Sequence, residues 1–238
     1  MSEDGGGRAR FFGQPLFYEV CRWIFLVVAT VWLGYRRWGM ENVPKEGGVL
    51  LVANHQSYVD PPLIGLCAHD RQFHPMAREG LFRVKWLSPI IRALNAFAVN
   101  EKGGDAKAMK EAIRLLHEGK VVLIFPEGSR THDGHVSEFK RGAALLVKKA
   151  ECPVVPVAIE GAFEAWPRGK RAWIGGNRVG VEVGRAIAHE ELMQDGADAA
   201  LRRLEREVEA LRVRLRGRLD AAGGRARSDQ AIVASPRA

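Results

Sequence analysis

A histidine and an aspartate stand five positions apart in the segment NHQSYVD, directly after the apolar run VLLVA. On one continuous helix, residues five apart would point about 140° away from each other, so His55 and Asp60 can face each other only across a turn. Two prolines follow Asp60, and proline favours the first turn of a helix. We therefore expect His55 at a strand end, a turn over 56–59, and Asp60 capping the next helix with its carboxylate near the imidazole.

The pairing of His55 with Asp60 has a specific chemical use. A carboxylate on one ring nitrogen fixes the histidine tautomer and raises the basicity of the other nitrogen, which then accepts a proton from a hydroxyl group. The alternative is that Asp60 only caps its helix and His55 is a hydrogen-bonded loop histidine. Taken alone, the pair is a candidate general base whose geometry must be shown.

A second candidate cluster follows the apolar run VVLIF and consists of Glu127, Gly128, Ser129 and Arg130. A glycine and a small residue just past a strand end, with an arginine beside them, are typical of turns that bind phosphate. Lys140 lies in FKRG, at the start of a predicted helix whose N-terminus favours an anion. The alternative is an ordinary Gly/Ser turn of an α/β protein.

Other motifs do not fit the chain. The spacing from Gly161 to Gly169 is too long for a phosphate-binding P-loop, and no G-x-S-x-G elbow gives Ser57 or Ser129 the setting of a hydrolase nucleophile. The segment HDGH at 132–135 is better interpreted as a polar loop, since no HExxH or CxxC pattern accompanies it. We therefore predict no metal site.

The elements that position these residues alternate along the chain from Gly39 onward. Strands are predicted at 49–53, 72–77, 96–100, 121–125, 154–159 and 179–183, and helices at 61–68, 81–94, 105–118 and 139–150. The strands are mostly short continuous apolar runs, as in a sheet covered on both faces. The pattern predicts one layered α/β domain with a largely parallel central sheet flanked by helices.

The N-terminal part differs in composition. Residues 1–10 are polar and glycine-rich and are predicted to be mobile, whereas 11–38 form a hydrophobic, aromatic helical segment. Its longest uncharged run, 23–35, would span roughly 20 Å as a helix, less than the ~30 Å of a bilayer's hydrocarbon core. The segment therefore either lies in the membrane interface, which its tryptophans favour, or packs as a buried helix of the core.

The C-terminal part is predicted to be a helix followed by a tail. Residues 199–219 carry one leucine-rich stripe on a charged helix, which either docks on its own domain or forms a coiled-coil seam. The α/β domain thus covers 39–220, and the composition of 221–238 predicts a disordered tail.

Composition narrows the class of protein. The chain has 238 residues, 47% of them hydrophobic, and a net charge of +8, so it can form a packed core and is not polytopic. Ten arginines gather in 200–238, but no stacking-aromatic or recognition-helix pattern accompanies them, so we do not expect nucleic acid as a partner. Three widely spaced cysteines indicate a reducing compartment.

Taken together, the motifs are far more specific than each alone. From about Trp38 to Pro167 the chain resembles the 1-acylglycerol-3-phosphate O-acyltransferase family, among the glycerolipid acyltransferases with the H-x-x-x-x-D signature. The resemblance rests on NHQSYVD, FPEGSR, FKRGA and VVPVAIEGA, in the family's order. It implies that His55 is the general base and Asp60 its partner.

The resemblance also implies binding roles. Glu127, Gly128 and Arg130 match the acceptor-binding motif, with Arg130 on the glycerol phosphate, and Pro156 lies in the motif often tied to the acyl donor. Arg78 stands where the family usually has a lysine, so a cation persists there.

The second family motif matches poorly. Where the family commonly ends in Asp-Arg, NAFAVNEKG offers Asn95, Asn100 and Glu101, which reverses a charge near the expected phosphate unless Lys102 replaces it. This departure leaves the acceptor open.

The implied reaction is acyl transfer from acyl-CoA or acyl carrier protein to the free hydroxyl of a lysophospholipid. The expected acceptor is 1-acylglycerol 3-phosphate, which gives phosphatidic acid. The acyl thioester is a co-substrate, and no cofactor is expected. The expected location is the cytoplasmic face of the membrane, peripheral or monotopic. The alternatives are another acceptor, such as glycerol 3-phosphate or a lyso-aminolipid, and a non-catalytic peripheral lipid-binding protein.

Overall fold

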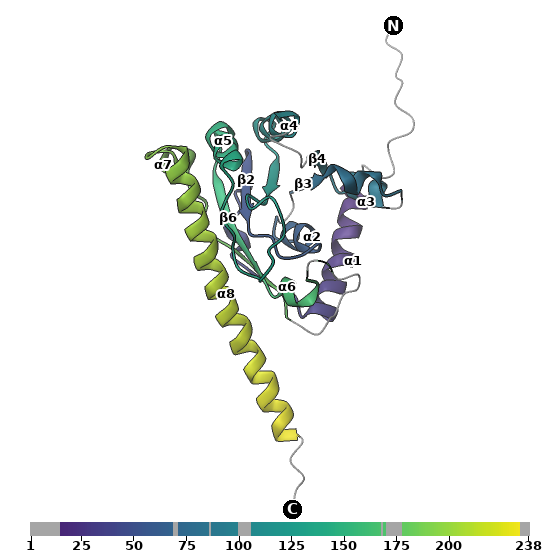
Figure 1. The fold of residues 1–238 in the computed structure, drawn as a ribbon. Helices are drawn as coiled ribbons and strands as arrows, with labels where there is room; N and C mark the ends of the chain where they lie inside the picture. The colour runs from purple at the N-terminus through teal and green to yellow at the C-terminus, as the bar shows by residue number, and fades with distance from the viewer. Residues whose placement is uncertain are drawn as a thin grey trace, which may run out of the picture.

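The centre of the molecule is a twisted seven-stranded sheet (Figure 1). The computed structural model describes residues 15–68, 71–85, 87–99, 106–167, 169 and 178–233. The strands are β1 (Arg36–Trp38), β2 (Val49–Ala53), β3 (Phe73–Arg78), β4 (Phe97–Val99), β5 (Val121–Ile124), β6 (Val154–Glu160) and β7 (Gly180–Val183). Their order is β1-β7-β6-β2-β5-β3-β4.

Every neighbouring pair of strands in this sheet is parallel except β6 and β7. The carboxyl ends of β6, β2, β5, β3 and β4 therefore share one edge, while β7 and β1 run the other way. Largely parallel sheets need cover on both faces, which explains the continuous apolar runs of β2 and β5. The α/β fold predicted from the sequence is confirmed.

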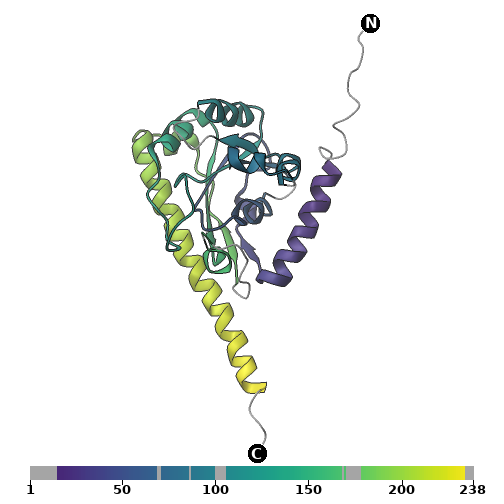
Figure 2. The same ribbon diagram turned by 45° about the vertical axis from the view of Figure 1, so that its right-hand side comes forward.

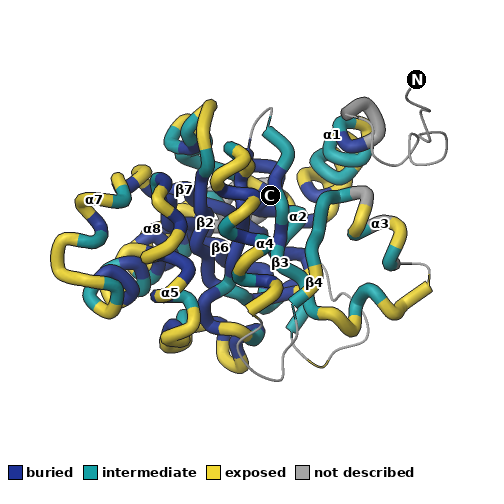
Figure 3. The backbone as a smooth tube through the Cα atoms, turned by 90° about the horizontal axis from the view of Figure 1, so that it is seen from above, coloured by how far each residue is buried: buried dark blue, intermediate teal, exposed yellow. Residues whose placement is uncertain are grey.

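Helices cover both faces of the sheet. They are α1 (Pro15–Leu33), α2 (Asp60–Gly65), α3 (Leu87–Ala93), α4 (Ala106–His117), α5 (Arg141–Ala150), α6 (Ala162–Ala165), α7 (His189–Leu192) and α8 (Ala197–Val233), with short 3-10 turns at Met40–Asn42 and Glu79–Arg83. Alternate strand residues enter two cores: Leu51 and Leu123 pack with α1, α2 and α6, whereas Leu50 and Val122 pack with α4, α5 and α8. Figure 3 shows the buried residues concentrated in the strands between these layers.

The N-terminal helix ends earlier than the sequence indicates. α1 stops at Leu33, and Gly34 adopts a left-handed φ of 53° that breaks the helix. Residues 36–38, which we placed in the helical segment, instead form β1 and pair with β7 at the edge of the sheet. Residues 1–14, including the predicted mobile segment, lie outside the described residues.

α1 contributes only one of its sides to the core. Tyr18, Ala29 and Leu33 are buried, so this side of the helix packs on the domain. Its other side carries an exposed apolar stripe: Val20, Trp23, Ile24, Val27, Val28, Val31 and Trp32. Among the described residues, the structure contains no helix with the length and apolarity needed to cross a membrane.

Two other helix predictions need correction. The helix expected at 81–94 is divided into a 3-10 turn at Glu79–Arg83 and α3, because Pro89 lacks an N–H and fits only the first turn of a helix. At the other end, α8 continues to Val233, past the predicted boundary at 219 and into the segment expected to be disordered. In Figures 1 and 2, α1 and α8 lie on opposite sides of the sheet, and α8 extends beyond the body of the domain.

Candidate active site

The sequence candidates gather at the carboxyl edge of the parallel strands. His55 comes just after β2, the turn 125–130 follows β5, and Arg78 ends β3. Since β2 and β3 both pair with β5, the three ends are neighbours. Open parallel sheets bind their ligands at this edge.

His55 and Asp60 are in direct contact. Nδ1 of His55 lies 2.8 Å from Oδ2 of Asp60, and the side chains are 18% and 0% exposed, respectively. The imidazole also stacks on Phe125, with ring centres 4.1 Å apart and planes 19° from parallel. With the carboxylate accepting Nδ1–H, the lone pair on Nε2 is available as a base.

Asp60 does not cap the following helix in the way the sequence suggested. It is the first residue of α2, and its carboxylate turns back toward the preceding loop. Oδ2 accepts the backbone N–H of Gln56 at 2.5 Å and that of Ser57 at 2.6 Å, together with the His55 ring. One oxygen therefore closes the turn and orients the imidazole at once.

Two amide side chains beside His55 hold the turn to the sheet, and sequence reasoning gave them no role. Asn54 is fully buried and makes two hydrogen bonds to the backbone of Ile159 in β6, at 2.9 and 2.8 Å. Gln56 is also fully buried and donates to the carbonyl of Gly134 at 2.9 Å. Buried polar groups are costly unless hydrogen-bonded, so polar residues in a turn next to a buried strand are the signal that could have indicated them.

Glu127 joins the second turn to the first. Its Oε1 accepts the backbone N–H of His55 at 2.7 Å, and its Oε2 accepts that of Ser137 at 3.0 Å. Burial raises the pKa of Glu127 to about 7, although these hydrogen bonds lower it. The carbonyl of His55 in turn accepts Thr131 N–H at 2.8 Å. Glu127 thus positions the histidine backbone in this structure.

The remaining candidates lie along the same turn. Gly128 has a φ of 68°, and a Cβ placed there would lie 2.8 Å from Nζ of Lys140, so the lysine side chain passes directly over the glycine. Ser129 is half-buried, Arg130 is 8% exposed, and Arg78 is half-buried at the end of β3. The structure brings Gly128, Ser129, Arg130 and Lys140 together, with Arg78 at the same sheet edge.

An aromatic side chain from the histidine turn contacts Arg130. The guanidinium carbon lies 3.5 Å from the centre of the Tyr58 ring, and Tyr58 meets Trp166 edge-on at 5.7 Å. Tyr58 is 49% exposed, so this pair lies at the surface of the site. A cation held over an aromatic face keeps its charge while its position is restricted.

Two further sequence candidates complete this comparison. Asn100, Glu101 and Lys102 of the poorly matching motif lie outside the described residues. Pro156, which the resemblance ties to the acyl donor, is a buried residue inside β6, opposite Val52 of β2 in the strand register. No group of three potential metal ligands occurs in the described part of the chain.

Comparison with known proteins identifies the family of this chain. The model of the family described as Acyltransferase matches residues 36–160, from β1 to the end of β6. The 1-acyl-sn-glycerol-3-phosphate acyltransferase of Bacillus subtilis is 31% identical over 144 residues, covering 60% of this chain and 71% of that protein. This chain belongs to the 1-acyl-sn-glycerol-3-phosphate acyltransferase family.

Other acyltransferases of this name cover the chain to different extents. The Streptococcus pneumoniae protein is 28% identical over 207 residues, covering 84% of this chain and 74% of that protein. The crystal structure of the 1-acyl-sn-glycerophosphate acyltransferase PlsC from Thermotoga maritima has a TM-score of 0.66 and 30% identity, covering 86% of this chain and 83% of that one. The match to the Borreliella burgdorferi relative covers only 49% of the length of that protein.

Proposed function

We propose that this protein transfers a fatty acyl group from an acyl thioester to the free hydroxyl of 1-acylglycerol 3-phosphate, giving phosphatidic acid. The observation that carries the proposal is the 2.8 Å contact between His55 Nδ1 and Asp60 Oδ2 in a chain of this acyltransferase family. The relatives' names support the acceptor.

His55 acts as the general base in this reaction. As the acceptor hydroxyl attacks the thioester carbonyl carbon, its proton moves to Nε2, and the buried carboxylate of Asp60 stabilises the imidazolium that forms. A C–O bond forms, the C–S bond breaks, and the departing thiolate takes the proton from Nε2. No acyl-enzyme and no cofactor are required.

The acceptor phosphate binds at the turn after β5. Arg130 supplies a charge-assisted hydrogen bond to the phosphate, and Lys140 and Arg78 add positive charge at the same edge. Gly128 leaves no side chain between Lys140 and the turn, and Ser129 offers a hydroxyl. Glu127 contributes indirectly by fixing the backbone of His55.

Both substrates are amphiphiles that lie in membranes, and α1 has a surface that can bind a membrane. The apolar stripe of α1 includes two tryptophans, Trp23 and Trp32, on the side that faces away from the domain. An amphipathic helix with such a face lies in the membrane interface. We place the protein on the cytoplasmic face of the membrane, a location that its free cysteines also suit.

The proposal is tested by thiol release from a long-chain acyl-CoA, using purified protein in detergent with and without 1-acylglycerol 3-phosphate. Acceptor-dependent release is expected, and His55→Ala should lower it by roughly 10²- to 10⁴-fold, the contribution of a positioned base. The matched control is His117→Ala, which removes an exposed histidine on α4 and should leave turnover unchanged.

Each other outcome has a defined meaning. A His55→Ala variant as active as the wild type would show that His55 is not the general base. Release with acyl carrier protein but not acyl-CoA would identify the donor, and release with glycerol 3-phosphate or a lyso-aminolipid would identify another acceptor. Vesicle binding without thiol release from any donor would favour a lipid-binding protein.

A further inference from the structure

The last residue of β6 is a buried carboxylate paired with the C-terminal helix. The side chain of Glu160 is 0% exposed, and its Oε2 accepts a hydrogen bond from Arg212 of α8 at 2.9 Å. Arg216, one turn further along α8, pairs with Oε1. A buried carboxylate needs such partners, because an unpaired buried charge is strongly unfavourable.

The same carboxylate also contacts the histidine turn. Oε2 of Glu160 accepts Nε2–H of Gln56 at 3.4 Å. The other contacts of the Gln56 side chain are Nε2 to the carbonyl of Gly134 at 2.9 Å and Oε1 from the N–H of Phe163 at 3.2 Å. Three hydrogen bonds therefore fix the Gln56 side chain, and Glu160 makes one of them.

The backbone of Gln56 completes the connection to the base. Its N–H donates to Oδ2 of Asp60 at 2.5 Å, and that same oxygen receives His55 Nδ1. A continuous set of hydrogen bonds thus runs from Arg212 through Glu160, Gln56 and Asp60 to the imidazole. Displacement of Gln56 would move the oxygen that orients His55.

We infer that Glu160, held by Arg212 of α8, is a positioning residue for the His55–Asp60 pair, so that the C-terminal helix helps to set the geometry of the base. This inference rests on the proposed function. It assigns to α8 a part in catalysis that the sequence motifs do not include.

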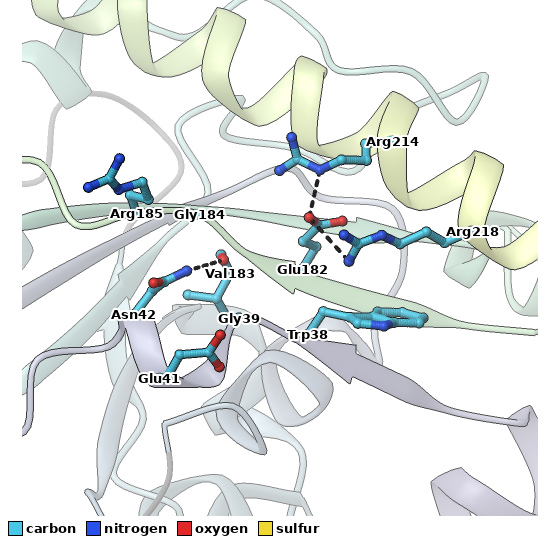
Figure 4. A pocket seen from close by; sticks show the side chains of 10 residues that line it. All are labelled: Trp38, Gly39, Glu41, Asn42, Glu182, Val183, Gly184, Arg185, Arg214 and Arg218. Atoms are coloured by element: carbon cyan, nitrogen blue, oxygen red, sulfur yellow. Dashed lines mark hydrogen bonds and ion pairs between the residues drawn. The ribbon is translucent and has the colours of Figure 1, made fainter.

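The neighbouring strand provides a matched control. Glu182 of β7 is 5% exposed and pairs with Arg214 at 2.7 Å and Arg218 at 3.4 Å on the same helix (Figure 4). It faces Ala158 in the strand register and lines a hollow of about 310 Å³ between β7, β1 and α8. The contacts described for Glu182 all lie on this side and none is made with the histidine turn.

The test compares Glu160→Leu with Glu182→Leu by kcat, acceptor KM and the midpoint of thermal unfolding. Both variants remove a buried carboxylate that pairs with arginines of α8, so both should lower the unfolding midpoint. Only Glu160→Leu should lower kcat, by roughly 10- to 100-fold and with little change in KM, because a misplacement of about 1 Å in a catalytic group is that costly. Unchanged kcat in Glu160→Leu, or an equal loss in Glu182→Leu, would overturn the inference.

Further variants show whether Glu160 acts through Gln56. Glu160→Gln keeps an oxygen that accepts from Gln56 and should recover most of the kcat lost in Glu160→Leu. Gln56→Leu combined with Glu160→Leu should lose no more than the more impaired single variant, because both changes break one connection. Additive losses would contradict this route.

Two controls keep the inference falsifiable. If Glu160→Leu does not fold, the same test is made by comparing the kcat of Arg212→Gln with that of Arg214→Gln. We then expect a loss of kcat only in Arg212→Gln. Wild type and His55→Ala are measured alongside: an inactive wild type refutes the proposed function, whereas an active wild type, an inactive His55→Ala and a fully active Glu160→Leu refute only the positioning role.

Discussion

Arg130 combines burial, charge and an aromatic contact at the turn after β5. It is 8% exposed, with its guanidinium 3.5 Å from the centre of the Tyr58 ring. Hydrogen bonds to charged groups contribute about 1.5–3 kcal/mol, so Arg130→Ala should raise the acceptor KM roughly 10- to 100-fold. Steady-state kinetics against acceptor concentration measures this, with Arg206→Ala, an exposed arginine of α8, as control. An unchanged acceptor KM would show that Arg130 does not bind the phosphate.

Glu127 makes stability depend on pH through a single buried carboxyl. Burial raises its pKa to about 7, well above the ordinary glutamate value of 4.5. Between these two pH values the folded protein binds a proton that the unfolded chain does not, so the free energy of unfolding falls as pH rises from 4.5 to 7 and then levels off. Glu127→Gln should lose this dependence. Urea unfolding of the wild type and of Glu127→Gln at several pH values checks the prediction. If the free energy of unfolding depended on pH in the same way in both proteins, the prediction would be contradicted.

At the scale of elements, the turn 125–130 depends on Gly128. Its φ of 68° is strained for any residue with a Cβ, and the added atom would lie 2.8 Å from Nζ of Lys140. Gly128→Ala should therefore destabilise the fold by about 1 kcal/mol, shift Lys140 and raise the acceptor KM. Gly217→Ala, in α8 where a Cβ meets nothing within 4 Å, should instead stabilise by about 0.5–1 kcal/mol. Thermal unfolding with acceptor titration distinguishes the two, and a fully stable Gly128→Ala would show that the turn does not need glycine.

Local pattern and tertiary pairing determine which elements the sequence could predict. Each of the six predicted strands forms, with small shifts at its ends, because a covered parallel strand is a short apolar run. β1 was missed because Arg36 and Arg37 give it no apolar run, and its pairing with β7 joins residues far apart in the chain. For the same reason, the pairing of Glu160 with Arg212 could not be predicted from either residue's neighbours.

The candidate site was more predictable than the helix ends. The turn between His55 and Asp60 follows from their spacing and the prolines after them, and the structure brings the two side chains into contact. The sequence did not indicate that the carboxylate closes the loop behind it rather than capping α2, since both arrangements suit an aspartate before proline. The end of α8 was misplaced because the composition of 221–238 suggested a disordered tail, yet the helix continues to Val233.

At the scale of the whole molecule, α1 presents an apolar stripe that no described part of the domain covers. Val31 and Trp32 are 79% and 69% exposed, and each large apolar side chain moved out of water contributes about 1.5–3 kcal/mol. Replacing Trp23 and Trp32 together by glutamate should therefore weaken binding to anionic vesicles by roughly 100-fold or more, while thiol release from substrates dissolved in detergent remains. The control is Val213→Glu on α8, which places one glutamate at an apolar residue that is 57% exposed on the opposite side of the sheet. Vesicle sedimentation measures the effect. Equal binding by both variants would show that another surface binds the membrane. If the double variant lost both vesicle binding and thiol release in detergent, α1 would be needed for the fold itself.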